Sequence, residues 1–321
     1  MSRAAAARPE APLISVVVVV VSDTTGGGGT LHLERSLDAL RRQVDPPAFE
    51  VVVAHPPGLP GVEELARRFP EATFVRAEGL RGFTGRGGSR EHHDELRARG
   101  LATARGEIVG LLEDHAVPDP HWCARVAQAH REDVAAVGGA IENGVDRPLA
   151  WAVYFCDFGR YQNPLPPGAP ATVSDANVAY KRPALQAVRP VWQDSFREPA
   201  VNAALRAAGQ RLALAPEVVV YQHRDDLRLR SAVAERFIWG RSYAAARAGG
   251  TGLSRRATYV ALSPLLPGVL LLRMIRNVLR RGRCRGAFAK ALPLTALLTA
   301  SWSAGELIGY LSGSAGSSRA S

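Results

Sequence analysis

The chain has 321 residues, of which 46% are hydrophobic, and it carries a formal net charge of +10. This length allows one large hydrophobic core, or one domain with an appendage. Three widely spaced cysteines, Cys123, Cys156 and Cys284, match neither a disulfide framework nor a zinc motif, which suits a reducing cytosol. The first twelve residues lack the apolar core of a secretory signal peptide, so none is expected.

Six consecutive valines, Val16–Val21, form the first predicted element. The run is too short to cross a bilayer, and β-branched side chains pack well in a strand that is covered on both faces. Further strands are predicted at Phe49–Ala54, Thr73–Val75, Ile108–Leu112, Ala135–Val137 and Leu212–Tyr221. Apolar residues at helical spacing predict helices at Leu33–Arg42, Val62–Phe69 and Asp94–Ala104. This alternation predicts an α/β fold with a mostly parallel sheet and helices on both faces.

The predicted strand Ile108–Leu112 runs directly into the polar cluster Glu113–His115. Sheets of this class bind ligands beyond the carboxyl ends of their strands. Carboxylates and an imidazole at such an end can hold a metal ion or a phosphate group, so the site is expected here. By contrast, His92–Asp94 is expected to begin an exposed helix. Gly26–Gly29 is expected to be a flexible turn, because it lacks the Gly-Lys-Ser/Thr of a P-loop.

Several short motifs follow one another around this strand. Leu96–Leu101, Ala104–Glu107, Glu113–His115 and Pro118–Trp122 are succeeded by Asp175–Arg182 and Phe196–Glu198. Their order resembles that of the family 2 glycosyltransferases of the membrane-associated bacterial type, which have a GT-A fold with a Rossmann-like sheet. Glu113–His115 stands in the place of that family's Asp-x-Asp motif, and Arg197-Glu198 in the place of its Glu-Asp pair. The resemblance covers roughly residues 12–245.

The resemblance implies that a nucleotide-sugar donor binds at the strand ends. The residues implied in donor binding are Val21, Ser22, Asp23, His55, Arg97, Glu113, Asp114 and Asn177. His55 replaces the aspartate that commonly contacts the nucleobase, and Arg97 is the candidate contact of the diphosphate. A divalent cation, Mn²⁺ or Mg²⁺, would neutralise the leaving diphosphate, with Asp114, His115 and His223 as its implied ligands. The imidazoles favour Mn²⁺.

An inverting transfer also needs a base beside the attacking hydroxyl. The resemblance assigns that role to Glu198, with the preceding Arg197 keeping the carboxylate ionised. The residues alone allow another interpretation. Glu198 could simply begin the helix Pro199–Ala208, where an acid in the first turn is ordinary capping chemistry.

The positive charge of the chain is concentrated near its C-terminus. Residues 228–290 carry a net charge of +13, which leaves −3 for the rest of the chain. Two apolar stretches, Thr258–Ile275 and Ala291–Gly305, lie in or beside this segment, and each is marginal as a membrane span. A cytosolic donor and the positive-inside rule place the regions before and after the first stretch on the same side. We therefore expect two helices in the interface of an anionic membrane, with a helical hairpin packed on the catalytic domain as the alternative.

The expected organisation is a disordered segment 1–11, a GT-A catalytic domain 12–227, a basic and apolar membrane-associating region 228–311 and a disordered tail 312–321. The expected activity is transfer of one sugar, with inversion, to a hydroxyl of a lipid or lipid-linked acceptor at the cytosolic face of the cell membrane. A soluble transferase acting on a small molecule or protein, and a non-catalytic nucleotide-sugar-binding scaffold, are the alternatives. Nucleic-acid binding is not expected, because the arginines are interleaved with aliphatic runs. No feature indicates the oligomeric state.

Overall fold

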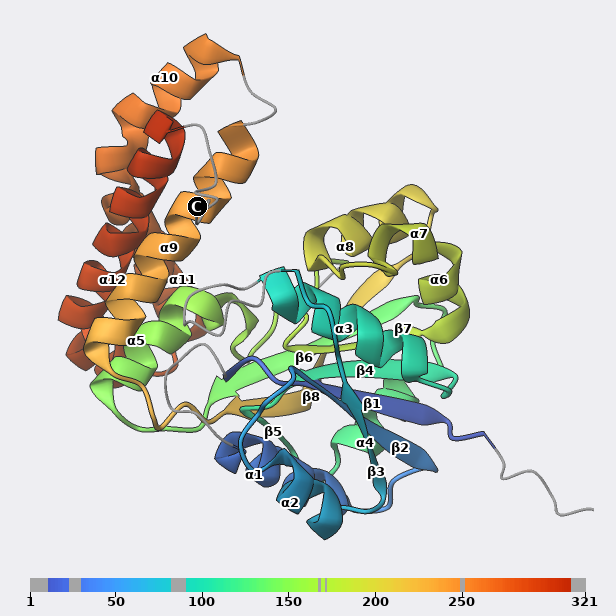
Figure 1. Ribbon diagram of the computed structural model, residues 1–321. Helices are drawn as coiled ribbons and strands as arrows, with labels where there is room; N and C mark the ends of the chain where they lie inside the picture. Colours follow the sequence, from blue (N-terminus) through green and yellow to red (C-terminus); the bar gives the residue numbers. More distant parts are fainter. Residues whose placement is uncertain are drawn as a thin grey trace, which may run out of the picture.

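The computed structural model describes residues 11–22, 30–81, 91–166, 169–170, 172–248 and 252–312. The strands of this described part form one eight-stranded sheet in the order β3-β2-β1-β4-β7-β6-β8-β5 (Figure 1). Their bounds are β1 Ile14–Val19, β2 Phe49–His55, β3 Ala72–Arg76, β4 Ile108–Glu113, β5 Ala116–Pro118, β6 Ala136–Asn143, β7 Asn177–Lys181 and β8 Leu212–Gln222. Strands β1 to β4 pair in parallel, and β6 pairs in parallel with β8. Strands β7 and β5 are antiparallel to their neighbours.

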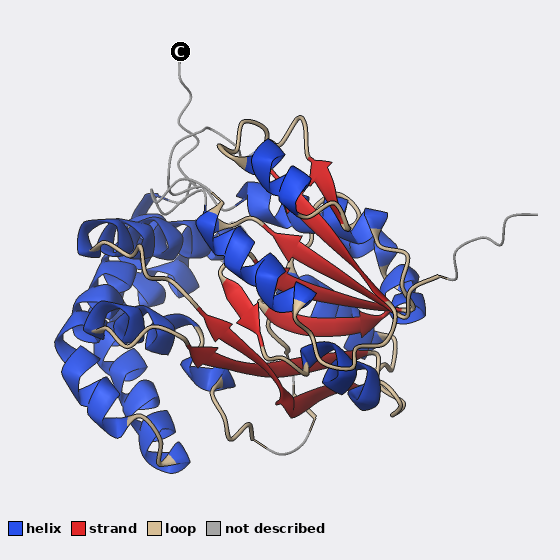
Figure 2. Ribbon diagram, turned by 90° about the horizontal axis from the view of Figure 1, so that it is seen from below, coloured by secondary structure: helices blue, strands red, loops and turns tan. Residues whose placement is uncertain are grey.

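Helices cover both faces of the sheet, and four more stand at its side (Figure 2). Those on the faces or at the sheet edge are α1 Leu31–Arg41, α2 Val62–Arg68, α3 Glu91–Thr103, α4 Trp122–Ala129, α5 Pro148–Asp157, α6 Arg182–Ala187, α7 Arg189–Trp192 and α8 Glu198–Ala207. The C-terminal helices are α9 Leu229–Ala248, α10 Leu253–Leu262, α11 Leu266–Arg281 and α12 Arg285–Ser312. Short 3₁₀ turns, η2 Gly159–Tyr161 and η3 Ser263–Leu265, complete the elements.

The valine run explains how one strand supports two cores. Side chains alternate across a strand, so Val16 and Val18 face one layer while Val17 and Val19 face the other. The first layer contains the apolar side of α1, and the second contains Leu96 of α3. Every residue of β1 is buried, as the sequence predicts for a central strand of a covered parallel sheet.

The strand order places a crevice at the end of β1. The chain moves outward from β1 through β2 to β3, and then returns to pair β4 with the opposite side of β1. The carboxyl ends of β1 and β4 therefore lie at a topological switch point, where α/β sheets bind their ligands. The predicted strands and helices are confirmed within a few residues. The sequence analysis missed the antiparallel strands β5 and β7.

The C-terminal helices pack on the sheet domain. Helix α12 lies against α9 and α5, and the Phe155 and Phe288 rings meet edge to face with centroids 4.9 Å apart. Phe288 and Leu298 belong to the same apolar cluster as Val16 of β1. The predicted apolar stretch Ala291–Gly305 is therefore the interior of a packed 28-residue helix.

The other predicted apolar stretch remains on the surface. Among the described residues, one helical segment, Leu253–Arg281, is long and apolar enough to cross a membrane, and only 6% of its most apolar window is buried. It comprises α10, η3 and α11 (Figure 1). Residues 1–10 and 313–321, which make up most of the segments expected to be disordered, and Gly26–Gly29 lie outside the described residues.

Candidate active site

The end of β1 is joined to the end of β4 through one carboxylate. The Val21 N–H donates to Asp114 Oδ1 at 3.1 Å, and the Ser22 hydroxyl donates to Asp114 Oδ2. The Asp114 N–H in turn donates to the Val19 carbonyl at 2.9 Å. The implied donor-binding residues Val21, Ser22 and Asp114 are thus brought together, with Asp114 buried beneath the other two. Asp23 lies outside the described residues.

His115 is held between two carboxylates. Its Nε2 lies 3.2 Å from Glu113 Oε2, and its Nδ1 lies 3.4 Å from Asp114 Oδ1. Burial alone would lower the pKa of His115, but the bonds to Asp114 and Glu113 outweigh it and raise the pKa to about 9. At neutral pH both ring nitrogens of His115 are therefore protonated, and the strand end presents a positive charge between two negative ones.

Arg97 lies beneath this cluster and contacts three acids. Its guanidinium is 3.2 Å from Glu113, 3.0 Å from Asp175 and 3.3 Å from Asp94. The side chain is only 2% exposed, and it is absent from the residues that line the adjacent cavity. This arginine is engaged by internal carboxylates, and its contact with a diphosphate stays a prediction. Its role in the structure is to permit their burial.

A cavity of about 200 Å³ opens above this cluster. Its walls are formed by Val21, His93, Glu113, His115, Asp157, Phe158, Arg160, Tyr161, Ser174, Asp175, Glu198, Arg224, Glu235 and Trp239. The implied base Glu198 and the strand-end residues Glu113 and His115 thus share one cavity. Glu235 and Trp239 belong to α9, so the region expected to begin at residue 228 also forms part of this wall.

Glu198 is the first residue of α8, as the capping interpretation expects, and it also faces the cavity, where its role as the base stays a prediction. The Asp175 N–H donates to Glu198 Oε2 at 3.4 Å, and the Asn202 amide donates to Oε1 at 3.4 Å. Burial and the nearby Asp175 carboxylate raise the pKa of Glu198 to about 7, against the opposing charges of Arg160 and Arg97. A carboxyl group of this kind can take up a proton near neutral pH.

Arg197 lies outside the cavity. It is the exposed N-terminal cap position of α8, makes no side-chain capping bond and does not line the cavity. The cations that act most on Glu198 are Arg160, from the turn after α5, and Arg97. The part expected of Arg197 in keeping Glu198 ionised stays a prediction.

Asn177 and His55 are also absent from the cavity wall, as Ser22, Arg97 and Asp114 are. Asn177 is fully buried in the sheet, where its amide accepts from the Trp122 indole at 2.9 Å and donates to the Ala140 and Val218 carbonyls. His55 ends β2 and lies 2.9 Å from the Pro56 carbonyl through Nδ1. Burial lowers the pKa of His55, so its ring is a neutral group beside the switch point.

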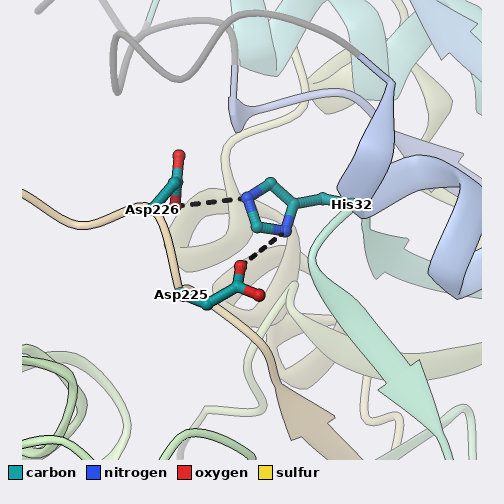
Figure 3. A group of neighbouring side chains, drawn as sticks. All are labelled: His32, Asp225 and Asp226. Carbon is teal, nitrogen blue, oxygen red and sulfur yellow. Dashed lines mark ion pairs between the residues drawn. The ribbon is translucent and has the colours of Figure 1, made fainter.

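The implied metal ligands do not converge into one group. His223 follows β8, and its backbone N–H donates to the backbone carbonyl of His115 at 2.8 Å. In the described part of the chain, the three-residue group whose ligand atoms converge is instead His32, Asp225 and Asp226 (Figure 3). His32 Nε2 lies 3.2 Å from Asp226, and Nδ1 lies 3.7 Å from Asp225. Sequence reasoning missed this group because α1 and the end of β8 are nearly two hundred residues apart.

Other cavity residues were also missed. His92 and His93 are 2% and 3% exposed, so the expectation of an exposed helix start is wrong for them, and His93 lines the cavity. Asp175 opens the motif Asp175–Arg182 and could have been found from it. Arg160 and Glu235 follow no recognisable motif, and only the packing of η2 and α9 brings them to the cavity.

The packing of Arg97 yields a stability prediction. Arg97→Leu should lower the free energy of unfolding by about 3–5 kcal/mol, because it leaves buried carboxylates without their countercharge. Arg99→Leu is the control, since Arg99 is exposed on the same helix and should change stability by about 0.5 kcal/mol or less. Denaturant unfolding measures both variants. Equal effects of the two substitutions would contradict the buried pairing.

The similarity of this chain to known proteins lies in its fold rather than in its sequence. No protein-family model and no curated protein matches the chain. The mannosyltransferase PcManGT from Pyrobaculum calidifontis, solved with GDP-Man and Mn²⁺, is similar with a TM-score of 0.50 and 19% identity, over 92% of this chain and 88% of that one. S. aureus TarS 1–349 aligns with a TM-score of 0.46 and 15% identity, over 90% of each chain.

Glucosyl-3-phosphoglycerate synthase from Mycobacterium tuberculosis aligns with a TM-score of 0.43 and 19% identity, over 70% of this chain and 74% of that one. The structural likeness to the mannosyltransferase extends over nearly the whole of both chains. Together with the strand order and the switch point between β1 and β4, it shows that the chain has the α/β fold of the GT-A glycosyltransferases.

Proposed function

We propose that the protein is an inverting glycosyltransferase that moves one sugar from a nucleotide-sugar donor to a hydroxyl acceptor. The observation that carries this proposal is the single cavity in which Glu198 faces Glu113 and His115 at the switch point of a GT-A sheet. The acceptor hydroxyl would attack the anomeric carbon, the nucleoside diphosphate would leave with the bonding electrons, and Glu198 would receive the proton. The similar mannosyltransferase was solved with GDP-Man, which supports this donor class.

The developing negative charge lies on the leaving diphosphate, so positive groups are needed at the strand ends. His115, which carries a proton at neutral pH, and Arg224 line the cavity on that side. Val21 and Ser22 fix the end of β1 over Asp114, which keeps the backbone in place for donor binding. His55, at the end of the neighbouring strand, is the proposed contact for the nucleobase.

A divalent cation, Mn²⁺ or Mg²⁺, is proposed as the cofactor, and the similar mannosyltransferase contains Mn²⁺. The donor set that fits a cation is His32, Asp225 and Asp226, because its oxygen and imidazole ligands already converge. Arg35 also approaches Asp225 at 3.0 Å and would have to share that carboxylate. When bound, the cation would supply positive charge to the diphosphate.

The base assignment predicts a pH dependence. Because the carboxylate must be deprotonated to act, release of GDP from GDP-mannose or of UDP from UDP-glucose should rise as the pH passes upward through about 7. Glu198→Gln should lower the rate by about 10²-fold or more and remove this dependence, while nucleotide binding persists. Glu217→Gln, at an exposed glutamate, is the matched control. Wild-type turnover by Glu198→Gln would reduce Glu198 to the first residue of a helix.

Cation binding can be followed by the loss of the free Mn²⁺ signal in electron paramagnetic resonance. Asp226→Asn and His32→Ala should each weaken Mn²⁺ binding by about tenfold or more, since each removes one ligand. The exposed His121→Ala should leave it unchanged. If His115→Ala weakens binding and Asp226→Asn does not, the cation belongs with Asp114, His115 and His223 instead.

We further propose that the acceptor is a lipid or lipid-linked molecule and that the protein acts at the cytosolic face of the membrane. The exposed apolar segment Leu253–Arg281 supports this, together with the net charge of +13 over residues 228–290. The same segment is unlike α12, whose apolar face is buried against α9 and α5. If α10 and α11 attach to the membrane, the packed helices α9 and α12 hold the sheet domain at the membrane surface.

Flotation with vesicles of phosphatidylcholine and phosphatidylglycerol tests this location. The full chain should float, and salt should weaken but not abolish the binding, because apolar burial is not screened. Replacing Leu262, Leu265 and Leu272 by Glu should abolish flotation, since these side chains are 53%, 64% and 55% exposed on α10–α11. Leu31→Glu, at a 64% exposed leucine on α1, is the control. Failure of the full chain to float would favour a soluble transferase.

A further inference from the structure

A second, larger cavity lies beside the proposed catalytic cavity. It has a volume of about 860 Å³, is open on one side and is lined by α5, η2, α9, α11 and α12. One part of its wall is apolar and aromatic, with Trp239, Leu266, Leu270, Met274, Leu298 and Trp302. A volume of this size accommodates a chain-like ligand as well as a small headgroup.

The two cavities adjoin. Asp157, Arg160 and Trp239 form part of the walls of both. Arg160 also lies close enough to Glu198 to act on the charge of that carboxylate. A ligand that occupies the larger cavity can therefore present one end to the proposed base.

The polar part of the larger cavity carries an excess of positive charge. Four arginines line it, Arg160, Arg236, Arg247 and Arg273, against two acids, Asp157 and Glu306. Arg236 donates to Asp157 through both terminal guanidinium nitrogens, Nη1 and Nη2, the latter at 2.6 Å. The charges of these two side chains therefore cancel. Among the described residues, no carboxylate lies within ion-pair distance of Arg160 or Arg273. These two side chains are suited to an anionic group such as a phosphate.

The outer wall of the cavity is α11, which belongs to the exposed apolar segment Leu253–Arg281. Leu266, Leu270 and Met274 face the cavity, while Leu265, Val269 and Leu272 of the same stretch are exposed. A single helix thus presents apolar side chains both to the cavity and to the outside. A lipid chain could enter along residues 265–272, which carry no polar side chain.

We propose that this cavity binds the acceptor, and that the acceptor is a lipid with one apolar chain and a phosphate headgroup. The phosphate contacts Arg160 and Arg273, the chain lies along Leu266, Leu270 and Met274, and the accepting hydroxyl, which the headgroup carries beside its phosphate, points toward Glu198. The assignment rests on the proposed glycosyltransferase function and adds to it the chemical class of the acceptor.

Dodecyl phosphate, kept below its micelle concentration, is the probe, and its affinity is measured by isothermal titration calorimetry on the full chain. It should bind at least about tenfold more tightly than dodecanol and more tightly than inorganic phosphate, because the cavity offers both cations and an apolar wall. Arg273→Ala and Arg160→Ala should each weaken its binding by about tenfold. Arg276→Ala is the matched control, since Arg276 is exposed on α11 and does not line the cavity.

Four results would overturn the proposal. Equal affinity for dodecanol and dodecyl phosphate would show an apolar site only. Equal affinity for inorganic phosphate would assign the arginines to a free anion. Equal weakening by Arg276→Ala would show a general effect of surface charge. Tighter binding of an acidic peptide than of dodecyl phosphate would point to a protein acceptor.

Release of nucleoside diphosphate by the wild-type chain, measured on the same preparation, separates the two proposals. A chain that releases GDP or UDP but shows no preference for dodecyl phosphate keeps its proposed function and loses this acceptor. A chain that binds dodecyl phosphate through Arg273 but never releases GDP or UDP keeps the lipid site and loses the transferase activity. The calorimetric result does not depend on turnover, so either failure can be recognised.

Discussion

The proposed active site depends on one buried guanidinium. Arg97 faces Glu113, Asp175 and Asp94, and without it three carboxylates could not lie together at the edge of the sheet. Glu113 fixes His115, and Asp175 contacts Glu198 through its backbone, so the strand end and the proposed base are both connected to Arg97. One side chain thereby sets the distance between the part of the cavity that would stabilise the leaving group and the part that would accept the proton.

This arrangement also explains how acids of different character share a small volume. Glu113 is paired with cations on two sides, Arg97 and His115, whereas Glu198 meets the negative charge of Asp175 at close range. Burial and, after it, the charge of Asp175 raise the pKa of Glu198, while His115 holds its proton. Carboxyl groups whose environments differ in this way can take different roles in one reaction, one electrostatic and one in proton transfer.

Much of the fold could be predicted from the sequence, because parallel strands and amphipathic helices leave periodic patterns. The valine run showed a strand covered on both faces, and Glu113–His115 showed where a site should lie. The short antiparallel strands β5 and β7 leave no such pattern, since pairing rather than composition defines them. Motif order placed Glu198 at the cavity, but it did not indicate that Arg97 is buried among acids or that Arg197 is exposed, because a motif does not state which way a side chain points. His32 and Asp226 meet only in the folded chain.

The position of α12 has a consequence for how the chain is made. Phe288, Ala291 and Leu298 complete the same apolar cluster that contains β1, so a segment synthesised early and one synthesised much later share one core. During translation the side of α5 that packs on α12 stays uncovered until α12 has left the ribosome. The apolar α11 emerges before that closure. Attachment to a bilayer can therefore precede completion of the core, and the nascent protein would finish folding at the surface where it is proposed to work.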